Sequence, residues 1–218
     1  MIRALIFDLD GTLVDTLSDI AQAMNGARAD LGLGPLPAEA YRSRVGWGSR
    51  ELSRLSLPEH LRTEEEILRL DAGFRARYEA APAVRSAPFP GIPGMLSELR
   101  AAGIPLCVLT NKPAEAVTPL LAALFPDLRF FRALGAEDGG PRKPDPAGAL
   151  RIARDLDLPP GQIGFVGDSG VDMRTAGNAG MVPIGVAWGY RDVEELRAEG
   201  AVRIVGTPAE LPALLSAL

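Results

Sequence analysis

Hydrophobic and polar positions follow three different patterns along the chain. Residues 2–7 form a short run that is apolar except for Arg3, which predicts a buried strand close to the start. Between residues 16 and 80, apolar positions recur at helical spacing and no segment favours a strand. From about residue 91 onward, short apolar runs alternate with helical stretches. The first predicted strand is therefore separated from the alternating part of the chain by a helical part.

The helical part begins at a potential helix cap, Asp15-Thr16, and its first helix ends at residues 32–35, where glycine and proline interrupt it. Further helices are predicted at about 37–45, 48–56 and 63–80. Proline and glycine in residues 88–91 mark the linker that leads out of this part. We therefore expect an inserted α-helical cap domain at residues 16–85.

The alternating part contains predicted strands at 104–109, 130–134, 163–166, 182–186 and 202–205. One predicted helix ends at Gly103, and others span 114–124, 145–156, 171–179, 193–198 and 209–217. Repeated strand–helix units are typical of a doubly wound parallel sheet. The predicted fold class is α/β, with a Rossmann-like parallel-sheet core made of residues 1–15 and 86–218.

Composition narrows the range of partners. The 218 residues carry a net charge of −5, which argues against nucleic acid or an anionic membrane surface as a partner. No apolar stretch approaches the roughly 20 residues of a membrane span, and no secretory signal is visible. The single cysteine, Cys107, lies in an apolar run, so we expect a buried, inert thiol in a reducing compartment. We expect a cytoplasmic protein, monomeric or homodimeric.

Four polar segments carry the candidate chemistry. Three of them, at residues 8–12, 108–112 and 166–172, end or follow predicted strands, and the fourth, at 142–146, precedes a helix. Parallel strands place their carboxyl ends at one edge of a sheet, where ligands of such folds bind. The paired carboxylates of Asp8 and Asp10 follow a buried strand, and they are costly there unless a cation meets them. The sequence therefore predicts a site at this edge, with a metal ion.

In this order, the four segments resemble the four motifs of the haloacid dehalogenase-like superfamily. The resemblance covers nearly the whole chain, including a helical cap inserted after the first motif. Within the superfamily, residues 15–21 and 186–191 resemble the phosphoglycolate phosphatase type. This resemblance implies a Mg²⁺-dependent phosphatase that hydrolyses a small phosphorylated metabolite, 2-phosphoglycolate or a similar monoester, through an aspartyl-phosphate intermediate.

The resemblance also assigns roles to the core residues. Asp8 would be the nucleophile, Asp10 the general acid and base, and Lys143 the counter-charge of phosphate and carboxylate. Mg²⁺ would be held by Asp8, Asp168 and the main-chain carbonyl of Asp10. Asp172 would orient a metal-bound water or Lys143, with helix capping as its structural alternative.

Phosphate binding and substrate choice would draw on further residues. Gly11 lets the backbone approach a phosphate closely, and Thr110 and Asn111 offer a hydroxyl and main-chain N–H groups. Lys112 is open between substrate binding and a solvated surface position. In the arginine-rich segment 41–54 of the cap, Arg50 and Trp47 are the candidates for contact with an anionic substrate. His60, the only histidine, is expected at the surface.

Several alternatives stay open or are weakened by particular residues. A pyrophosphatase or nucleotidase of the same superfamily fits the same motifs. A sugar-phosphate mutase fits less well, because residues 16–85 contain no lysine and the first cap helix has no histidine. A 2-haloacid dehalogenase lacks the equivalent of Asp10. A phospho-accepting signalling module would use similar residues, but such modules are about half this length.

Overall fold

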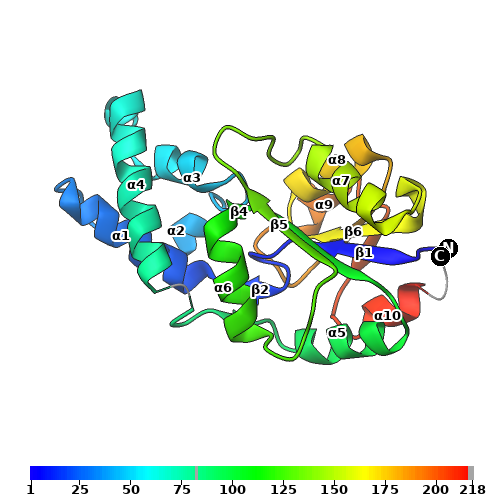
Figure 1. Ribbon diagram of the computed structural model, residues 1–218. Helices are drawn as coiled ribbons and strands as arrows, with labels where there is room; N and C mark the ends of the chain where they lie inside the picture. Colours follow the sequence, from blue (N-terminus) through cyan, green and yellow to red (C-terminus); the bar gives the residue numbers. More distant parts are fainter. Residues whose placement is uncertain (82, 216–218) are drawn as a thin grey trace.

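A sheet of parallel strands forms the centre of the structure, a computed structural model that describes residues 1–81 and 83–215 (Figure 1). Within these residues the sheet has six strands in the order β5-β4-β1-β6-β7-β8, and every neighbouring pair is parallel. The strands are β1 (Ala4–Phe7), β4 (Leu106–Pro113), β5 (Arg132–Ala136), β6 (Ile163–Gly167), β7 (Val182–Val186) and β8 (Arg203–Val205). The predicted α/β fold with a doubly wound parallel sheet is therefore confirmed.

Helices cover both faces of this sheet because its strands alternate their side chains between two apolar layers. Leu5 and Phe7 of β1 join the layer that contains α5 (Ile92–Ala101), α6 (Ala114–Leu124) and α10 (Glu210–Leu215). Ala4 and Ile6 join the opposite layer, beneath α7 (Ala147–Leu156) and α8 (Gly170–Ala179). A further helix, α9 (Val193–Ala198), packs beside α8 and β7. The central strand β1 is thus fully enclosed, and its carboxyl end is held rigidly.

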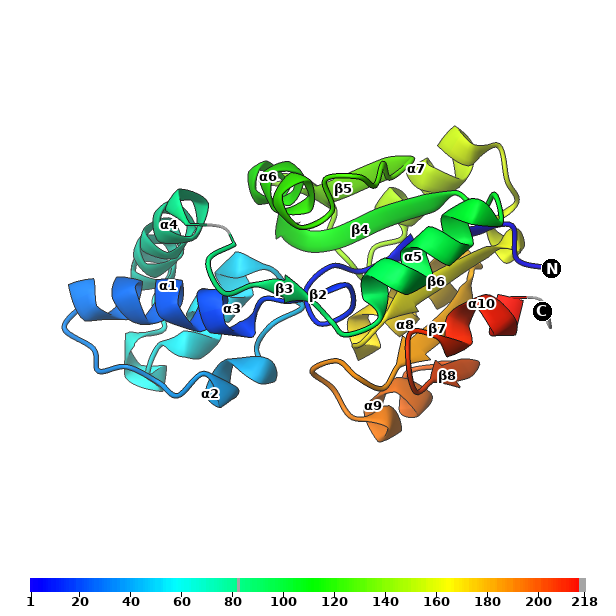
Figure 2. The ribbon, with the colours of Figure 1, turned by 90° about the horizontal axis from the view of Figure 1, so that it is seen from below.

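The residues between Asp15 and Ala87 form a helical unit beside the sheet (Figure 2). Its helices are α1 (Leu17–Asp30), α2 (Glu39–Arg42), α3 (Ser49–Ser56), a short 3₁₀ helix (Glu59–Leu61) and α4 (Glu64–Ala80). They surround an apolar cluster in which Met24, Tyr41 and Leu70 are fully buried, and Ala116 and Tyr190 from outside the unit also belong to it. The chain enters and leaves this unit through two antiparallel strands, β2 (Val14–Asp15) and β3 (Ala87–Pro88). We refer to the unit as the cap and to the rest as the core.

Strand β4 differs from its sequence prediction in a way that matters for the site. It continues through Thr110, Asn111 and Lys112 as far as Pro113, whereas the apolar pattern predicted an end at residue 109. Its polar end is buried, and its register with β5 shifts between Leu109 and Pro113. The pattern of apolar residues reveals a strand only where its side chains are apolar. The polar residues at the end of β4 therefore gave no sign that the strand continues.

The remaining boundaries agree with the prediction to within a few residues, except that β2 and β3 are too short to leave a pattern. The helix expected at 209–217 is seen over Glu210–Leu215, and residues 216–218 lie outside the described part. Cys107 is buried, and this burial raises the pKa of its thiol to about 12, while His60 is exposed. Among the described residues, no helix has the length and apolar character needed to cross a membrane.

Candidate active site

The four polar segments meet at the carboxyl edge of the sheet, facing the cap. Asp8 and Asp10 directly follow β1, and Asp168 directly follows β6. Lys143 lies in the loop before α7, and Asp172 lies in the first turn of α8. All five side chains are buried. The parallel sheet therefore brings together residues that are up to 164 positions apart in the chain.

Three of these carboxylates form a cluster around one lysine. Asp8, Asp168 and Asp172 each place a carboxylate oxygen within 4.8 Å of the others. The Lys143 ammonium lies 2.8 Å from Asp8 Oδ1 and 2.6 Å from Asp172 Oδ1. One lysine thus neutralises only part of the negative charge that the fold concentrates here.

Burial shifts the titration of this cluster. It raises the pKa of Asp8 to about 7, against the opposing effect of the Lys143 charge and with a further increase from Asp172. Burial also raises the pKa of Asp168 to about 8, and the negative charges of Asp172 and Asp8 add to this increase. Burial would lower the pKa of Lys143, but the adjacent carboxylates outweigh it and raise the value overall. The cluster thus offers several carboxylate oxygens and fewer positive than negative charges. Such a group of ligands suits a small divalent cation.

The carboxylate of Asp10 does not belong to this cluster. It accepts hydrogen bonds from the Lys112 ammonium at 2.8 and 3.1 Å and from Thr16 Oγ1 at 2.6 Å. Lys112 is itself buried, so the alternative of a solvated surface lysine is wrong. Thr16 occupies the N-cap position of α1, yet its side chain binds Asp10 and caps nothing. The two aspartates of the first motif therefore face different lysines.

Asp168 is held in place by groups that the sequence analysis did not identify. Its carboxylate accepts hydrogen bonds from Thr12 Oγ1 at 3.1 Å and from the main-chain N–H of Tyr190 at 2.7 Å. Gly11 and Gly189 pass so close that a Cβ on either would lie 2.3 and 2.2 Å from atoms of the Asp168 side chain. Gly11 also has φ = +85°, a region that favours glycine. The sequence feature that could have indicated the contacts of Gly189 and Tyr190 is the segment 186–191, which the sequence analysis used only for the resemblance to the phosphoglycolate phosphatase type.

Asp172 contacts Lys143 and also caps a helix. Besides binding Lys143, its Oδ2 accepts hydrogen bonds from Ser169 N at 3.1 Å and Ser169 Oγ at 2.6 Å, which caps α8. Asn111 connects the second and third segments, since its amide donates to Lys143 O at 3.0 Å and accepts from Lys143 N at 2.8 Å. The same amide donates to Gly46 O of the cap at 2.9 Å. Lys143 is therefore fixed both by its side chain and by its backbone.

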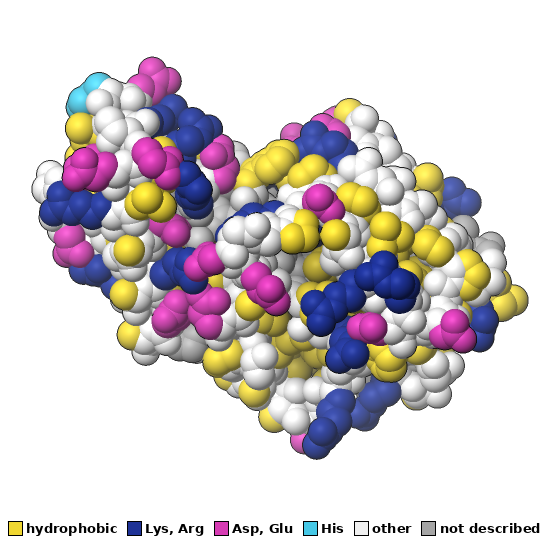
Figure 3. Space-filling view, turned by 45° about the horizontal axis from the view of Figure 1, so that its top comes forward, with side chains coloured by type: hydrophobic (Ala, Val, Ile, Leu, Met, Phe, Trp, Pro, Cys, Tyr) yellow, Lys and Arg dark blue, Asp and Glu magenta, His cyan; other side chains and the backbone are white. Residues whose placement is uncertain are grey.

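A cavity lies between this site and the cap, where the space-filling view shows an indentation between two lobes (Figure 3). The core contributes Asp8, Asp10, Thr110, Asn111 and Lys112 to its lining. The cap contributes mainly apolar or weakly polar side chains and glycines, among them Ile20, Val45, Gly46, Ser49, Leu52, Phe74 and Tyr78. The predicted phosphate-binding residues Thr110 and Asn111 thus share one cavity with Asp8 and Asp10.

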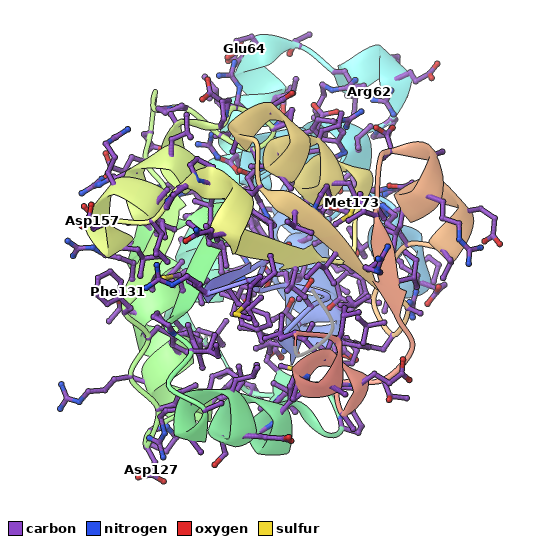
Figure 4. All side chains as sticks on the ribbon, turned by 90° about the vertical axis from the view of Figure 1, so that its right-hand side faces the viewer. Arg62, Glu64, Asp127, Phe131, Asp157 and Met173 are labelled. Carbon is purple, nitrogen blue, oxygen red and sulfur yellow. The ribbon has the colours of Figure 1, made fainter. Side chains whose placement is uncertain are left out.

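The two cap residues proposed for substrate contact lie elsewhere. Arg50 does not line the cavity; it pairs with Glu64, and its side chain is 58% exposed. Figure 4 shows Glu64 at the outer end of α4, far from the sheet. Trp47 stacks beside Arg174 of α8, 5.1 Å from ring centroid to guanidinium carbon. Helical spacing alone did not fix the orientation of Arg50, because α3 is short, and Trp47 lies before the first residue of that helix.

Arginines join the cap to the core on two sides of the cavity. Arg75 of α4 contacts Glu115 of α6 and Asp138 of the loop after β5, the latter at 3.0 Å. On the other side, Arg191 of the core donates hydrogen bonds to the carbonyl oxygens of Arg42, Ser43 and Val45. These contacts hold the cap against the core and enclose the cavity.

Comparison with known proteins shows the family of this chain. A family model of haloacid dehalogenase-like hydrolases matches residues 2–180. A phosphoglycolate phosphatase of Agrobacterium fabrum is 37% identical, over 98% of this chain and 92% of its own length. An N-acetylmuramic acid 6-phosphate phosphatase of Pseudomonas aeruginosa is 35% identical, over 96% and 93%.

Solved structures share the fold. A predicted phosphoglycolate phosphatase from Haemophilus somnus has a TM-score of 0.89 and 30% identity, with 98% of this chain and 97% of that chain covered. The structure of CbbY from Rhodobacter sphaeroides in complex with phosphate has a TM-score of 0.80 and 30% identity, with 97% and 96% covered. The similarity therefore extends over both the core and the cap.

Proposed function

Because this chain belongs to the haloacid dehalogenase-like hydrolases, and is a phosphatase of the phosphoglycolate phosphatase type, we propose that it hydrolyses 2-phosphoglycolate or a similar small phosphate monoester in a Mg²⁺-dependent reaction through an aspartyl-phosphate. The observation that carries the proposal is the position of Asp8. Its carboxylate is buried at the end of β1, beside Lys143, and Asp8 lines the cavity between core and cap.

The charges of the site support a divalent metal. The cluster of Asp8, Asp168 and Asp172 contains one lysine, Lys143, so its three carboxylates, when ionised, leave two negative charges uncompensated. The raised pKa values of Asp8 and Asp168 reflect this excess together with burial. One Mg²⁺ would balance the excess, held by Asp8 and Asp168 with the main-chain carbonyl of Asp10. When bound, it would offset the repulsion between a carboxylate and a phosphate dianion.

In the proposed first step, an oxygen of Asp8 attacks the phosphorus atom and the bond from phosphorus to the leaving oxygen breaks. Asp10 donates its proton to that oxygen, so the alcohol departs neutral. Lys143 holds Asp8 and balances charge on the transferring phosphoryl group. Gly11, the Thr110 hydroxyl and the main-chain N–H groups of Thr110 and Asn111 are the proposed phosphate contacts.

In the second step, water attacks the aspartyl-phosphate and the bond from phosphorus to Asp8 breaks. Asp10, now ionised, accepts the proton of that water. The contacts of Asp10 with Lys112 and Thr16 support this assignment, because they direct its carboxylate away from the acidic cluster and into the same cavity. Asp172 positions Lys143 and shapes the start of α8. Closure of residues 16–85, as a cap domain, would exclude bulk water from both steps.

The test is release of phosphate from 2-phosphoglycolate and from a panel of other phosphate compounds, with and without Mg²⁺. The panel includes p-nitrophenyl phosphate, nucleotides, pyrophosphate and hexose phosphates. Repeated turnover of a monoester that stops with EDTA supports the proposal. Release of one phosphate per chain and no more would indicate a phospho-accepting signalling module. Preference for pyrophosphate or nucleotides, or isomerisation of a sugar phosphate, would favour the alternatives within the superfamily.

A further inference from the structure

Two buried side-chain atoms in the lining of the cavity have no hydrogen-bond partner among the described residues. They are Asp8 Oδ1 and the Tyr78 hydroxyl oxygen. Asp8 Oδ1 lies 2.8 Å from the Lys143 ammonium, so an opposite charge compensates it. The Tyr78 hydroxyl lies beside the Lys112 ammonium, but an ammonium can only donate, so the phenol O–H has no acceptor among the described residues. A buried hydroxyl without a partner costs free energy, and in a cavity its natural partner is a bound ligand.

The position of Tyr78 relates it to the organic part of the substrate. The Lys112 ammonium lies over the Tyr78 ring, 4.3 Å from its centroid, and binds the carboxylate of Asp10 on its other side. In the proposed reaction Asp10 protonates the leaving oxygen. The carbon attached to that oxygen must therefore extend from Asp10 toward the cap, where Tyr78 lines the cavity.

Apart from the Ser49 hydroxyl, the rest of this wall offers little to bind a polar group. Ile20, Val45, Leu52 and Phe74 are apolar, and Ala116 of the core continues the apolar surface. Arg75 also lines the cavity, but its guanidinium is engaged by Glu115 and Asp138. Glu79, when ionised, only accepts hydrogen bonds and offers no donor to an acceptor oxygen of the substrate. Burial raises the pKa of Tyr78, so its phenol stays protonated and can donate.

We propose that Tyr78 is a specificity-determining residue, whose hydroxyl donates a hydrogen bond to an acceptor oxygen on the leaving alcohol. The substrate class is then phosphate monoesters whose alcohol carries a carboxylate, carbonyl or hydroxyl oxygen within reach of the cap wall. Plain alkyl phosphates of the same size would leave the phenol unpaired. This inference rests on the proposed phosphatase function.

The experiment compares 2-phosphoglycolate with ethyl phosphate, a monoester of similar size whose alcohol part lacks an acceptor. The wild-type protein and Tyr78→Phe are assayed with Mg²⁺ for kcat/KM on both substrates. The wild type should prefer 2-phosphoglycolate, and Tyr78→Phe should reduce this preference about 10-fold or more, mainly through KM. Phenylalanine keeps the ring beneath Lys112, and the inhibition constant of inorganic phosphate should stay unchanged.

Tyr41→Phe is the matched control. Tyr41 is buried in the cap, donates to Asn25 Oδ1 at 2.6 Å and does not line the cavity. This variant should lose some stability and keep the substrate preference of the wild type. An unchanged preference in Tyr78→Phe, or no preference in the wild type, would overturn the role of Tyr78. If instead the wild type turned over no phosphate ester of the panel, the proposed function itself would fail.

If Tyr78→Phe folds poorly, product inhibition of the wild-type protein still tests the role of the Tyr78 hydroxyl. Glycolate should inhibit the hydrolysis of p-nitrophenyl phosphate at lower concentration than ethanol or propanol, because only glycolate offers an acceptor to the phenol. Equal or weaker inhibition by glycolate would contradict the proposal.

Discussion

The ammonium of Lys112 contacts both carboxylate oxygens of Asp10, at 2.8 and 3.1 Å. The side chains are 4% and 11% exposed, so the ion pair is almost completely desolvated. A buried pair of this kind is stable only while both partners are present, because removal of one leaves the other charge unpaired. The general acid of the proposed reaction is therefore also part of the structural support of the site.

Asp10→Asn should consequently lower both activity and stability. We expect the free energy of unfolding to fall by about 3 kcal/mol, because Lys112 becomes a buried charge without a counter-charge. Phosphate release should fall by about 10²-fold or more, since proton transfer to the leaving oxygen is lost. Urea unfolding and a phosphate-release assay measure the two effects.

The double variant Asp10→Asn/Lys112→Met separates the effect on stability from the effect on activity. It removes both charges and should recover most of the lost stability, while its activity should stay low. Wild-type rates in Asp10→Asn would remove Asp10 from the mechanism. A double variant no more stable than Asp10→Asn would show that the pair does not act as described.

Asp8→Asn should abolish turnover without unfolding the protein. The amide cannot attack phosphorus as a carboxylate does, so phosphate release should fall by about 10³-fold or more. The substitution also removes a buried negative charge, while Lys143 keeps its 2.6 Å contact with Asp172. The melting temperature without metal should therefore be equal to or above that of the wild type. Residual turnover close to the wild-type rate would exclude Asp8 as the nucleophile.

Stability and metal binding should depend on pH between about 4 and 8. The folded-state pKa values of Asp8 and Asp168 are raised to about 7 and about 8, from the ordinary value of 3.8. The metal-free folded protein then binds more protons than the unfolded chain in this range, so its stability should fall as pH rises. Mg²⁺ must displace these protons, and its stabilising effect should grow over the same range.

Melting temperatures in EDTA and in excess Mg²⁺, at about pH 6 and about pH 8.5, provide the measurement. The difference between the two conditions should be larger at the higher pH. In Asp8→Asn that difference should be smaller at both pH values, because one ligand is lost. Equal Mg²⁺ stabilisation at both pH values in the wild type would contradict the assignment of these carboxylates as ligands.

Gly11→Ala should impair metal binding through Asp168. The new Cβ would lie 2.3 Å from Asp168 Oδ2 and 2.8 Å from the ring of Tyr190, so the carboxylate must move. We expect about a 10-fold or greater loss of Mg²⁺ affinity, measured as the Mg²⁺ concentration that gives half-maximal activity. The same substitution at Gly32, also at positive φ but with no atom within 4 Å, is the control. Gly32→Ala should cost about 1 kcal/mol of stability and leave the Mg²⁺ dependence unchanged.

Much of the core could be predicted from the sequence because apolar periodicity and strand-end polarity reflect the same sheet. Asp8 and Asp168 follow β1 and β6, as their apolar runs predict. Thr110–Lys112 are different, because they continue β4 beneath the cap and are buried among polar groups. Their burial depends on residues of the cap that lie far away in the sequence, and local patterns carry no information about such contacts.

The same reason explains which of the predicted site residues lie together in the structure and which do not. Asp168 lies beside Asp8 because β1 and β6 are neighbouring parallel strands, whose ends meet at one edge of the sheet. Arg50 faces solvent and Glu64 because the rotation of a short helix is set by tertiary packing. The support of Asp168 by Gly189 and Tyr190 depends on close approach of the loop after β7, which becomes visible only in three dimensions.

The two-stranded ladder of β2 and β3 has a consequence for the architecture as a whole. It pairs Val14 with Pro88 and Asp15 with Ala87, so the chain leaves and re-enters the core at neighbouring points. In polymer terms, all residues between these pairs form one loop, and the core holds the two ends of this loop together. The entropy of such a closure grows only slowly with loop length, so insertions of very different size could occupy this point at similar cost. Under the proposed function, the core would break the phosphate ester and the inserted unit would select it, so the selecting part could change while the core stays the same.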